Sequence, residues 1–348
     1  MSRPGAVAVL GGGSWGTALA LHLTRLGMAP RLWIFEAELT ALVRARLENA
    51  WYLPGIPVPS EVHPTSALDE ALKEAELAII AVPSHVFASV VEAARPWLGP
   101  RVSLLSATKG LDPVEARRMS EILAELAPTS PVAVLSGPTF AREVALGRPT
   151  AAVVASTDPD LSSRLQRVLA SREFRLYTNR DVVGVELGGA LKNIMAIATG
   201  ISDGLGLGEN ARAALITRGL AEISRLGVAL GASPLTFAGL AGLGDLVLTC
   251  TGSLSRNRAL GLALAAGKSL VEAQAETRMV AEGVKTTESA LRLAHRVGVA
   301  LPICEEVGAV LFQEKSPQAA LAALLERDVR PEEEPVLVRS PERGSGHA

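Results

Sequence analysis

The chain has 348 residues, of which 48% are hydrophobic and 20% are charged, and its formal net charge is −2. This length suffices for two domains with separate cores, and the near-neutral charge excludes the basic surface that nucleic-acid binding requires. No uninterrupted apolar stretch reaches the ~18 residues of a membrane span, and the first residues lead into a strand rather than into a signal peptide. We therefore expect a cytoplasmic globular protein that binds no nucleic acid and does not insert into a membrane.

The cysteines and histidines are spaced too widely to form a cluster. Cys250 and Cys304 lie outside any Cys-x-x-Cys pattern, and the histidines are scattered along the chain. Structural zinc sites and disulfide frameworks show short, regular spacings of these residues. We expect neither a disulfide nor a bound metal.

The first informative segment joins an apolar strand, 7–10, to a helix that begins near Ser14. Gly11, Gly13 and Gly16 fit the pattern G-x-G-x-x-G within it. The first glycine permits a tight turn, the second lets the backbone approach a pyrophosphate, and the third lets the helix pack on the strand. The pyrophosphate would lie on the N-terminal amides of the helix. The segment predicts a dinucleotide-binding turn, the alternative being a glycine turn that binds no nucleotide.

Glu36 follows the second predicted strand, 30–35, about 20 residues after the glycines. In dinucleotide-binding folds an acidic side chain at this place accepts hydrogen bonds from the hydroxyls of the adenosine ribose. The alternative is that Glu36 only begins the helix predicted over 36–48, since acidic residues stabilise the first turn of a helix. Glu36 is therefore a candidate cofactor contact.

Five further apolar segments alternate with helical patterns and are predicted to be strands: 77–82, 102–106, 132–136, 151–156 and 174–178. The segment 51–63 is predicted to be a loop with a short strand. Strands that alternate with helices form parallel sheets with helices on both faces. The fold class predicted for this half of the chain is α/β, a Rossmann-like doubly wound sheet.

Two loops follow strands at their carboxyl ends, where ligands bind in open α/β sheets. One contains Lys109 beside Gly110, and the other spans 137–143. A lysine at such a place suits an anionic ligand, although a solvated loop lysine is the more common case. From the residues alone, Lys109 is a candidate ligand contact.

The periodicity changes after the last predicted strand. Residues 182–327 show helical spacing broken by glycines, with no alternating strand. We expect a dinucleotide-binding domain over 1–182 and an all-helical, substrate-binding domain over 183–330. The remaining residues, 331–348, are charged and rich in Pro, Ser and Gly, which is typical of a disordered tail.

Lys192 lies off the apolar stripe of the first helix in the second domain. Its own face is lined by Gly188 and Gly189. Two glycines inside a helix cost about 1 kcal/mol each relative to alanine, so a neighbour must require the space. A ligand beside Lys192 would explain them, and so would the close approach of another backbone.

Asp245 is the one acid in a glycine-rich, apolar segment. An unpaired buried carboxylate is costly, so it needs a partner, and Lys192 is the natural candidate. Ser255, Arg256 and Asn257 follow as a dense set of donors suited to phosphate, because arginine binds phosphate oxygens through two parallel hydrogen bonds. As an isolated cluster they would more often form a solvated turn.

Over nearly its whole length, to about residue 330, the sequence resembles the NAD(P)-dependent glycerol-3-phosphate dehydrogenases of the bacterial type. Seven motifs in order carry the resemblance: 11–18, 107–110, 136–141, 186–193, 242–246, 255–257 and 280–283. The resemblance implies that Lys192 is the catalytic proton donor and acceptor. It also implies substrate contacts from Lys109, Gly137, Thr139, Lys192, Asp245, Ser255, Arg256 and Asn257. The cofactor contacts that it implies are Ser14, Trp15, Lys109, Ala141, Arg256, Val280 and Glu282.

The activity that this resemblance implies is reversible hydride transfer between NAD(P)H and glycerone phosphate. The product, sn-glycerol 3-phosphate, is the backbone of phospholipids, and members of the family are usually homodimers. The family often has Arg or His where this chain has Phe35. That difference favours NAD(H) over NADP(H).

Two other classes of protein fit parts of the pattern. Another two-domain, lysine-dependent dehydrogenase, of the hydroxyacid or 6-phosphogluconate type, would share both domains. The donors at 255–257, following Asp245, favour the triose phosphate substrate instead. A non-catalytic dinucleotide sensor would keep the glycine turn but has no need of Lys192 and Asp245.

Overall fold

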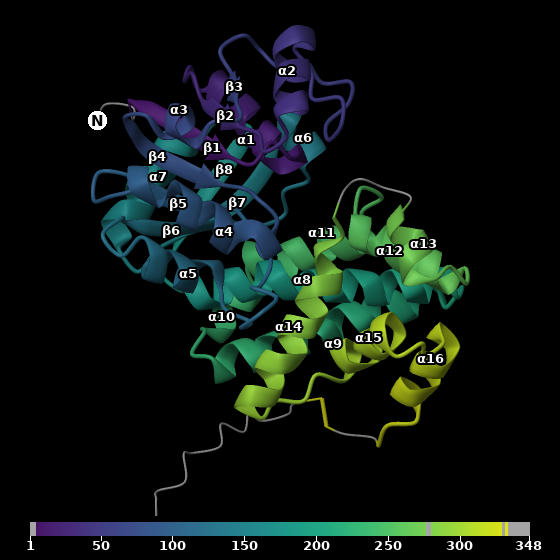
Figure 1. Ribbon diagram of the computed structural model, residues 1–348. Coiled ribbons are helices and arrows are strands. Elements are labelled where there is room, and N and C mark those ends of the chain that lie inside the picture. The colour runs from purple at the N-terminus through teal and green to yellow at the C-terminus, as the bar shows by residue number, and fades with distance from the viewer. Residues whose placement is uncertain (1–4, 276–279, 329–330, 333–348) are drawn as a thin grey trace, which may run out of the picture.

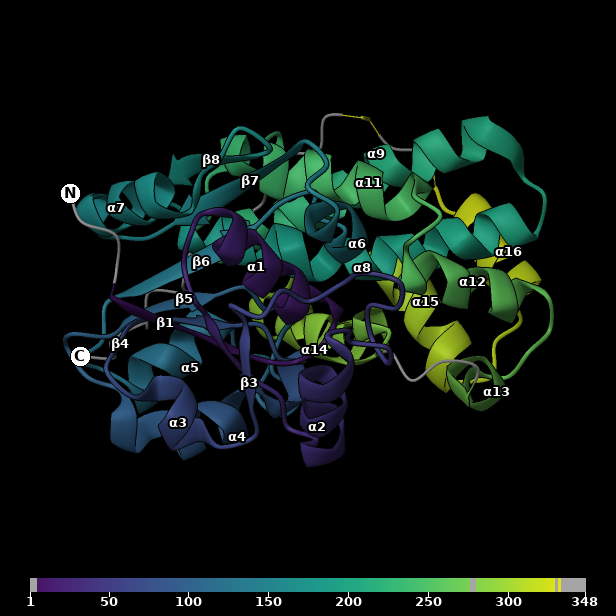
Figure 2. The ribbon, with the colours of Figure 1, turned by 90° about the horizontal axis from the view of Figure 1, so that it is seen from above.

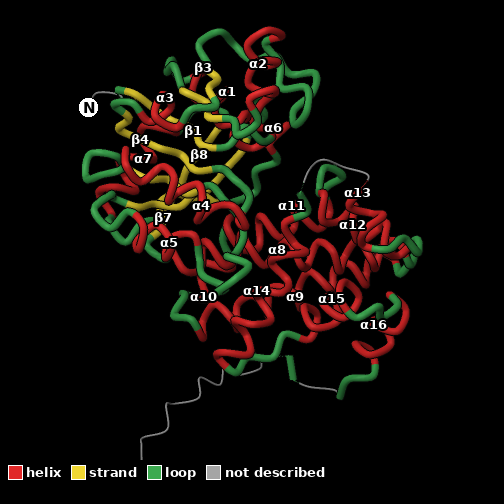
Figure 3. Tube along the Cα trace, viewed as in Figure 1, coloured by secondary structure: helices red, strands yellow, loops and turns green. Residues whose placement is uncertain are grey.

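The computed structural model describes residues 5–275, 280–328 and 331–332. It divides into a half that contains a sheet and a half built from helices (Figure 1). Figure 3 shows the strands gathered in the first half and only helices and loops in the second. Of the tail predicted over 331–348, all but the first two residues lie outside the described part of the chain.

One sheet of eight strands forms the first half, in the order β3-β2-β1-β4-β5-β6-β7-β8. The strands are β1 (Ala6–Leu10), β2 (Arg31–Trp33), β3 (His63–Thr65), β4 (Ala75–Ile80), β5 (Ser103–Ser106), β6 (Val132–Ser136), β7 (Thr150–Ala155) and β8 (Phe174–Asn179). Every neighbouring pair is parallel except β6 and β7. The prediction of a mostly parallel α/β sheet is confirmed, and the antiparallel pairing of β6 with β7 is an additional feature.

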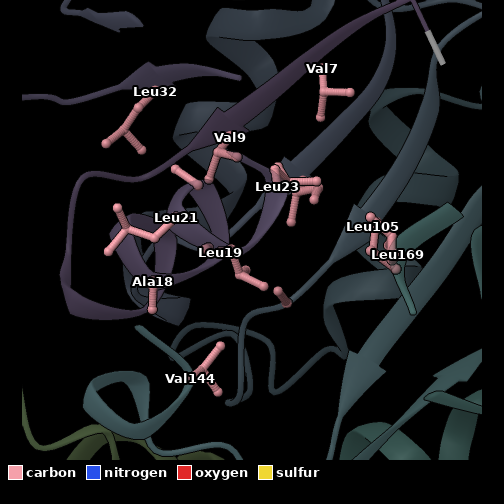
Figure 4. Packing of buried hydrophobic residues seen from close by; sticks show 14 of the residues in the cluster. Val7, Val9, Ala18, Leu19, Leu21, Leu23, Leu32, Leu105, Val144 and Leu169 are labelled. Carbon is pink, nitrogen blue, oxygen red and sulfur yellow. The ribbon is translucent and has the colours of Figure 1, made fainter. Parts of the chain in front are cut away.

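Helices cover both faces of the sheet because side chains on successive residues of a buried strand point to opposite faces. Val7 and Val9 of β1 join the core that packs under α1 (Ser14–Arg25), α2 (Ala37–Arg46), α6 (Ala141–Ala145) and α7 (Pro159–Leu169). Ala8 and Leu10 join the core under α3 (Leu68–Leu72), α4 (Ser84–Ala94) and α5 (Met119–Leu126), and a 3₁₀ turn, Arg95–Trp97, follows α4. Figure 4 shows Val9 with Leu19 and Leu23 of α1 in the first core.

The strand order creates a crevice between β1 and β4. From β1 the chain passes outward to β2 and β3, and it then returns to β4 on the other side of β1. The loops that follow β1 and β4 therefore diverge, and open α/β sheets bind ligands at such a point. The glycine motif follows β1, so the topology places it at the expected ligand-binding edge.

The second half is organised around α8 (Val182–Gly204), which has no exposed residue between Gly184 and Ser202. The helices that surround it are α9 (Gly208–Ala229), α10 (Pro234–Phe237), a π-helical turn (Leu240–Gly244), α11 (Asp245–Thr251), α12 (Arg256–Ala265), α13 (Leu270–Ala275), α14 (Glu282–Val297), α15 (Pro302–Phe312) and α16 (Pro317–Leu325). Figure 2 shows α8 lying among α9, α11, α12 and α15. The helical character predicted for this half is confirmed.

Two stretches are long and apolar enough to span a membrane by length and composition, Val182–Gly204 and Pro234–Thr251. In α8, 89% of the most apolar window is buried inside the protein. The second stretch is interrupted by the π-helical turn and contains Asp245, which is fully buried against α8. α8 is a core helix of the second half, since a helix that is apolar all round is one that other helices cover; in the second stretch 44% of the window is buried.

Buried polar contacts join the two halves. The Glu186 carboxylate on α8 accepts hydrogen bonds from Arg118 Nη1 at 2.9 Å and from the backbone N–H of Ser120 at 2.8 Å, both at the start of α5. The Ser289 hydroxyl on α14 donates to the carbonyl of Asp112 at 3.0 Å. These contacts hold α8 and α14 against the loops that follow the sheet.

Candidate active site

The glycine loop has the geometry that its sequence predicts. Gly11 has φ +125°, and a Cβ there would lie 2.6 Å from the carbonyl oxygen of Ala81. A Cβ on Gly16 would lie 1.8 Å from the carbonyl oxygen of Gly11, so the helix could not pack this closely on the turn. A Cβ on Gly13 would meet nothing within 4 Å. The loop is therefore tight where it packs and open at Gly13, as a pyrophosphate on the N-terminus of α1 requires.

Trp15 connects this loop to the loop that carries Lys109. Its indole Nε1 donates to the carbonyl of Ala107 at 3.1 Å, at the carboxyl end of β5. Ser14 begins α1 beside it. The first turn of α1 and the Lys109 loop are thus held together at one edge of the sheet.

Asp245 is shared by two lysines from different halves of the protein. Its Oδ1 accepts a hydrogen bond from Lys192 Nζ, and its Oδ2 lies 2.8 Å from Lys109 Nζ. Lys109 Nζ also donates to the Gly137 carbonyl at 2.7 Å and to the Thr139 hydroxyl at 3.0 Å. Five residues that the sequence analysis assigned to substrate binding therefore meet at one point, and the predicted pairing of Asp245 with Lys192 is confirmed.

Burial makes Lys192 an unusually weak base for a lysine. Its exposed fraction is 6% and that of Asp245 is 0%. Desolvation lowers the pKa of Lys192 to about 7, the charge of Lys109 acts in the same direction, and Asp245 opposes both. An amine with this pKa exchanges its proton readily near neutral pH.

The glycines beside Lys192 are explained by close packing. A Cβ on Gly188 would lie 2.4 Å from the carbonyl oxygen of Ala241, and a Cβ on Gly189 would lie 2.4 Å from the Ser136 hydroxyl. Of the two explanations considered above, the close approach of another backbone therefore accounts for Gly188. Gly189 instead accommodates the end of β6, which lies next to the Lys109 side chain.

The three donors at 255–257 have different environments. Ser255 caps α12 by accepting a hydrogen bond from the Arg258 N–H at 3.3 Å, and Arg256 is exposed at the first position of this helix. Asn257 is buried: its Nδ2 donates to Asn193 Oδ1 at 2.9 Å, and its Oδ1 accepts from the Gly283 N–H at 3.0 Å. The charge of Arg256 interacts with that of Glu282 on α14, whereas Asn257 ties α12 to α8 and α14.

The predicted cofactor contacts of the helical half lie near the Lys109 loop. Glu282, which begins α14, accepts a hydrogen bond from the Ser84 hydroxyl at 2.7 Å, and a Cβ on Gly110 would lie 3.3 Å from the same carboxylate. Burial raises the pKa of Glu282, and the charge of Arg256 lowers it. Val280 is half-buried two residues earlier.

Two predicted cofactor contacts lie elsewhere in the sheet half. Ala141 begins α6, which packs against α1. Glu36 stands at the end of β2 as the N-cap residue of α2, but its side chain makes no capping hydrogen bond. Instead its Oε1 accepts from the Tyr52 hydroxyl at 2.9 Å. Glu36 is thus held by a residue of the 47–58 loop and not by the helix that it begins.

Three polar residues that the sequence did not mark as candidates lie at the site in the structure. The Thr249 hydroxyl donates to the Asp245 carbonyl at 2.6 Å and lies 3.4 Å from Oδ1 of its carboxylate. Asn193 and Ser84 contact Asn257 and Glu282 as described above. Thr249 follows Asp245 by four residues, which places both on one face of the helix, so this spacing was a usable signal; Asn193, next to Lys192 in the sequence, gave none.

The fold and the site together define a class. A protein that combines a glycine loop at the switch point of this sheet with a buried lysine of lowered pKa is a two-domain dehydrogenase that uses NAD(P). Such enzymes bind the dinucleotide on the sheet half and hold the reacting substrate against the helical half.

Comparison with known proteins gives the particular family. The model of the NAD-dependent glycerol-3-phosphate dehydrogenase N-terminus matches residues 6–162, and the model of its C-terminus matches residues 181–322. The glycerol-3-phosphate dehydrogenase (NAD(P)+) of Geobacter sulfurreducens is 51% identical over 329 residues, which cover 94% of this chain and 98% of that protein. The enzyme of Aeromonas salmonicida is 49% identical over the same shares of the two chains. This chain belongs to the NAD(P)-dependent glycerol-3-phosphate dehydrogenases.

Solved structures agree with this assignment. The crystal structure of glycerol-3-phosphate dehydrogenase from Coxiella burnetii is similar with a TM-score of 0.90 and 44% identity, covering 92% of this chain and 99% of that one. A ketopantoate reductase from Ralstonia eutropha has a TM-score of 0.60 at 18% identity and shares the fold alone. The resemblance found in the sequence is therefore confirmed as a family membership.

Proposed function

We propose that the chain catalyses reversible hydride transfer between NAD(P)H and glycerone phosphate, which gives sn-glycerol 3-phosphate for phospholipid synthesis. The observation that carries the proposal is the buried cluster of Lys192, Asp245 and Lys109. It puts an amine with a pKa of about 7 beside Lys109, whose loop is bonded to Trp15 of the glycine motif. The family of the relatives supports the choice of substrate.

Lys192 is the proposed proton donor in reduction and proton acceptor in oxidation. When bound, the nicotinamide ring supplies the hydride to C2 or takes it back. As the C2 carbonyl is reduced, its π-electron pair moves to oxygen, and Lys192 gives its proton to that oxygen. Asp245 orients the ammonium group of Lys192 and balances its charge, while Thr249 fixes the start of α11.

The proposed substrate contacts surround this amine. Lys109, Gly137 and Thr139 form one wall through their mutual hydrogen bonds. Arg256, with Ser255, is the proposed phosphate site, since guanidinium and helix N-terminal amides both favour an anion. Asn257 is a further proposed contact of the phosphate, and its side chain is held by Asn193 and Gly283.

The proposed cofactor site runs along the loops after β1, β2 and β5. Gly11, Gly13, Gly16, Ser14 and Trp15 would hold the pyrophosphate and its neighbours. Glu36 would accept hydrogen bonds from the adenosine ribose, which favours NAD(H) over NADP(H). The remaining proposed contacts are Lys109, Ala141, Arg256, Val280 and Glu282.

We also propose a homodimer in the cytoplasm and the domain limits 1–182 and 183–330. The limits are supported by the change from β8, which ends at Asn179, to α8, which begins at Val182. The homodimer rests on the family alone. Light scattering on the purified protein would measure the mass of the assembly and so test the proposed homodimer.

A spectrophotometric assay tests the proposed activity. Oxidation of NADH is followed with glycerone phosphate and with a panel of other ketones, including 2-oxo acids. We expect glycerone phosphate to give the highest kcat/KM in the panel. A higher value for a 2-oxo acid would support a hydroxyacid dehydrogenase, and no turnover with any ketone would support a dinucleotide sensor.

A further inference from the structure

Asn49 lies in the loop that follows α2, and its side chain reaches the glycine loop. It is fully buried. Its Nδ2 donates to the Gly12 carbonyl at 2.8 Å and to the Thr17 hydroxyl at 2.8 Å, while its Oδ1 accepts from the Tyr52 N–H at 3.2 Å. One amide group therefore joins the 47–58 loop, the glycine turn and the first turns of α1.

The bond to Gly12 fixes the direction of the next peptide N–H. The structure has no cis peptide bond among the described residues, so the C=O of Gly12 and the N–H of Gly13 belong to one trans peptide plane and point in opposite directions. Asn49 holds the carbonyl toward the protein interior, and this directs the Gly13 N–H away from it. A Cβ on Gly13 would meet nothing within 4 Å, so there is open space beside this residue for a ligand.

The same peptide is held from a second side. A Cβ on Gly12 would lie 2.6 Å from the Ile34 side chain, so this residue is packed against the end of β2. The Thr17 hydroxyl, which accepts one proton of the Asn49 amide, lies 3.5 Å from the Gly12 carbonyl oxygen. The Gly12–Gly13 peptide cannot rotate without breaking buried hydrogen bonds, and such breaks are costly.

The loop that presents Asn49 is itself fixed. The Glu48 carboxylate accepts from the Gly55 N–H at 2.8 Å, and Glu48 forms an antiparallel bridge with Pro57. Leu53, Ile56 and Val58 anchor the loop in the core under α1 and α2. Asn49 therefore meets the glycine turn as part of a folded segment rather than as a flexible side chain.

We propose that Asn49 is a positioning residue for the dinucleotide: it orients the Gly13 N–H toward the pyrophosphate. The inference rests on the proposed function, because it requires that the glycine loop binds a dinucleotide. Asn49 acts through the backbone and touches neither the adenosine nor the reacting atoms. Its loss is expected to weaken the binding of diphosphate-containing ligands and to leave adenosine binding nearly unchanged.

The test uses the full-length chain and three probes, NADH, ADP and adenosine. Asn49→Leu removes the amide at similar size, and Asn49→Asp replaces its donors with an oxygen that repels the Gly12 carbonyl. Ser130→Ala is the matched control, because it also removes a buried hydrogen bond to a backbone carbonyl, that of Gly99 at 2.9 Å. Dissociation constants are measured by quenching of intrinsic fluorescence and by competition with NADH, and thermal stability is recorded in parallel.

Both Asn49 variants should bind NADH and ADP about tenfold or more weakly. The reason is that a misdirected Gly13 N–H no longer donates to the charged pyrophosphate. Adenosine affinity and kcat at saturating NADH should change less than about twofold, since neither depends on this peptide. Ser130→Ala should lower thermal stability without a change in the ratio of ADP to adenosine affinity. Equal losses for ADP and adenosine would overturn the inference and leave Asn49 a purely structural residue.

Two further outcomes separate this inference from the function on which it rests. A wild-type chain that binds ADP no more tightly than adenosine would contradict the anion site itself. A wild-type chain that prefers ADP, together with Asn49 variants that keep this preference, would contradict the inference alone.

If both Asn49 variants fail to fold, Thr17→Val replaces them, because it removes the second acceptor of the Asn49 amide. Thr17→Val should then weaken the binding of ADP more than the binding of adenosine. Equal losses of the two affinities would overturn the inference.

Discussion

Lys109 of the sheet half lies 2.8 Å from Asp245 of the helical half, on the carboxylate oxygen that Lys192 does not occupy. One buried acid therefore balances two lysines. With both lysines protonated the cluster carries one excess positive charge, which suits an anionic substrate but disfavours the charged form of Lys192. Burial is the main reason that the pKa of Lys192 falls to about 7; Asp245 opposes this fall, and the charge of Lys109 adds to it.

Lys192→Ala is expected to abolish turnover while NADH affinity changes by less than about threefold, because the amine acts on the substrate oxygen and the glycine loop holds the pyrophosphate. Steady-state kinetics and fluorescence titration with NADH measure the two effects separately. Lys315→Ala is a suitable control, since this lysine pairs with Glu306 at 2.6 Å, away from the glycine loop. A variant that keeps most of the wild-type turnover, or one that loses NADH binding in parallel, would remove Lys192 from the proposed role.

The pH dependence should have opposite signs in the two directions of the reaction. Reduction of glycerone phosphate requires protonated Lys192, so its rate should fall as pH rises through the pKa of about 7. Oxidation of glycerol 3-phosphate requires the neutral amine, so its rate should rise over the same interval. Lys109→Ala removes a positive charge that lowers the pKa of Lys192, and it should therefore move both profiles to higher pH. Profiles of kcat/KM between pH 5.5 and 9 in both directions check this, and two profiles of the same sign would exclude one lysine in both roles.

The sheet and the chemistry-bearing residues could be predicted because their signals are local. Strands such as Val132–Ser136 are continuous apolar runs, and the glycine turn has fixed spacing. The pairing of Asp245 with Lys192 could be predicted because a buried acid needs a cationic partner; the second partner, Lys109, was not predicted. These features depend on short segments whose physical requirements are strict.

What could not be predicted depends on contacts between distant segments. The antiparallel pairing of β7 with β6 depends on the path of the chain after α6, which the spacing of residues in the sequence does not indicate. Asn49 looks like an ordinary loop residue until the fold places it 2.8 Å from Gly12. The fold joins the Asn257 side chain to Asn193 of α8 and to Gly283 of α14, which its position beside Arg256 in the sequence did not indicate.

Glycerone, which lacks the phosphate, should be reduced orders of magnitude more slowly than glycerone phosphate, because binding energy at the phosphate positions the reacting carbonyl. Arg256→Ala should narrow this difference by lowering kcat/KM for the phosphorylated ketone far more than for glycerone. Arg258→Ala offers a neighbouring control, since Arg258 pairs with Asp203 at 2.7 Å within the helical half. Similar efficiency of the wild-type enzyme with both ketones would show that residues 255–257 are not a phosphate site.

Glu222 should make folding stability depend on pH. It is 3% exposed, and burial raises its pKa from 4.5 to about 7, although the N–H groups of Ile303 and Cys304 oppose the shift. A carboxyl whose pKa is raised on folding stabilises the protein below its unfolded pKa, and that stability is lost as pH rises from about 4.5 to about 7. The shift corresponds to about 3 kcal/mol at most.

Glu222→Gln removes this titration. The free energy of unfolding of the wild type, relative to the Gln variant, should therefore be higher at pH 5 than at pH 8, by about 1–3 kcal/mol. Urea denaturation of both proteins at the two pH values measures the difference. Glu209→Gln, at an exposed position paired with Arg212, should show no such dependence, because surface pairs contribute little. A difference between wild type and Glu222→Gln that is independent of pH would mean that Glu222 does not titrate in this range.

The end of β2 should make the enzyme prefer NADH to NADPH. A 2′-phosphate bound there needs a cation, and residues 33–37 include none. Glu36 is instead held with its carboxylate against the Tyr52 hydroxyl at 2.9 Å, and Arg44 on the next helix donates to the Pro64 carbonyl at 2.8 Å. Two unit charges about 4 Å apart repel by roughly 4 kcal/mol at an effective dielectric of 20, and solvent and salt reduce this.

Even a third of that repulsion energy corresponds to an affinity for NADH about tenfold higher than that for NADPH. Phe35→Arg combined with Glu36→Ser should shift the ratio of kcat/KM values toward NADPH, because it supplies a cation and removes the repelling carboxylate. Phe35 is 77% exposed, so an arginine there meets no packing constraint. Tyr52→Phe is the intermediate case, since it frees Glu36 without changing its charge and should leave NADH preferred. Values of kcat/KM for both cofactors at low salt test this preference. Equal values for the wild type, or a preference for NADPH, would contradict it. Either result would mean that Glu36 points away from the ribose and that Arg44 or Arg46 turns back to bind the phosphate.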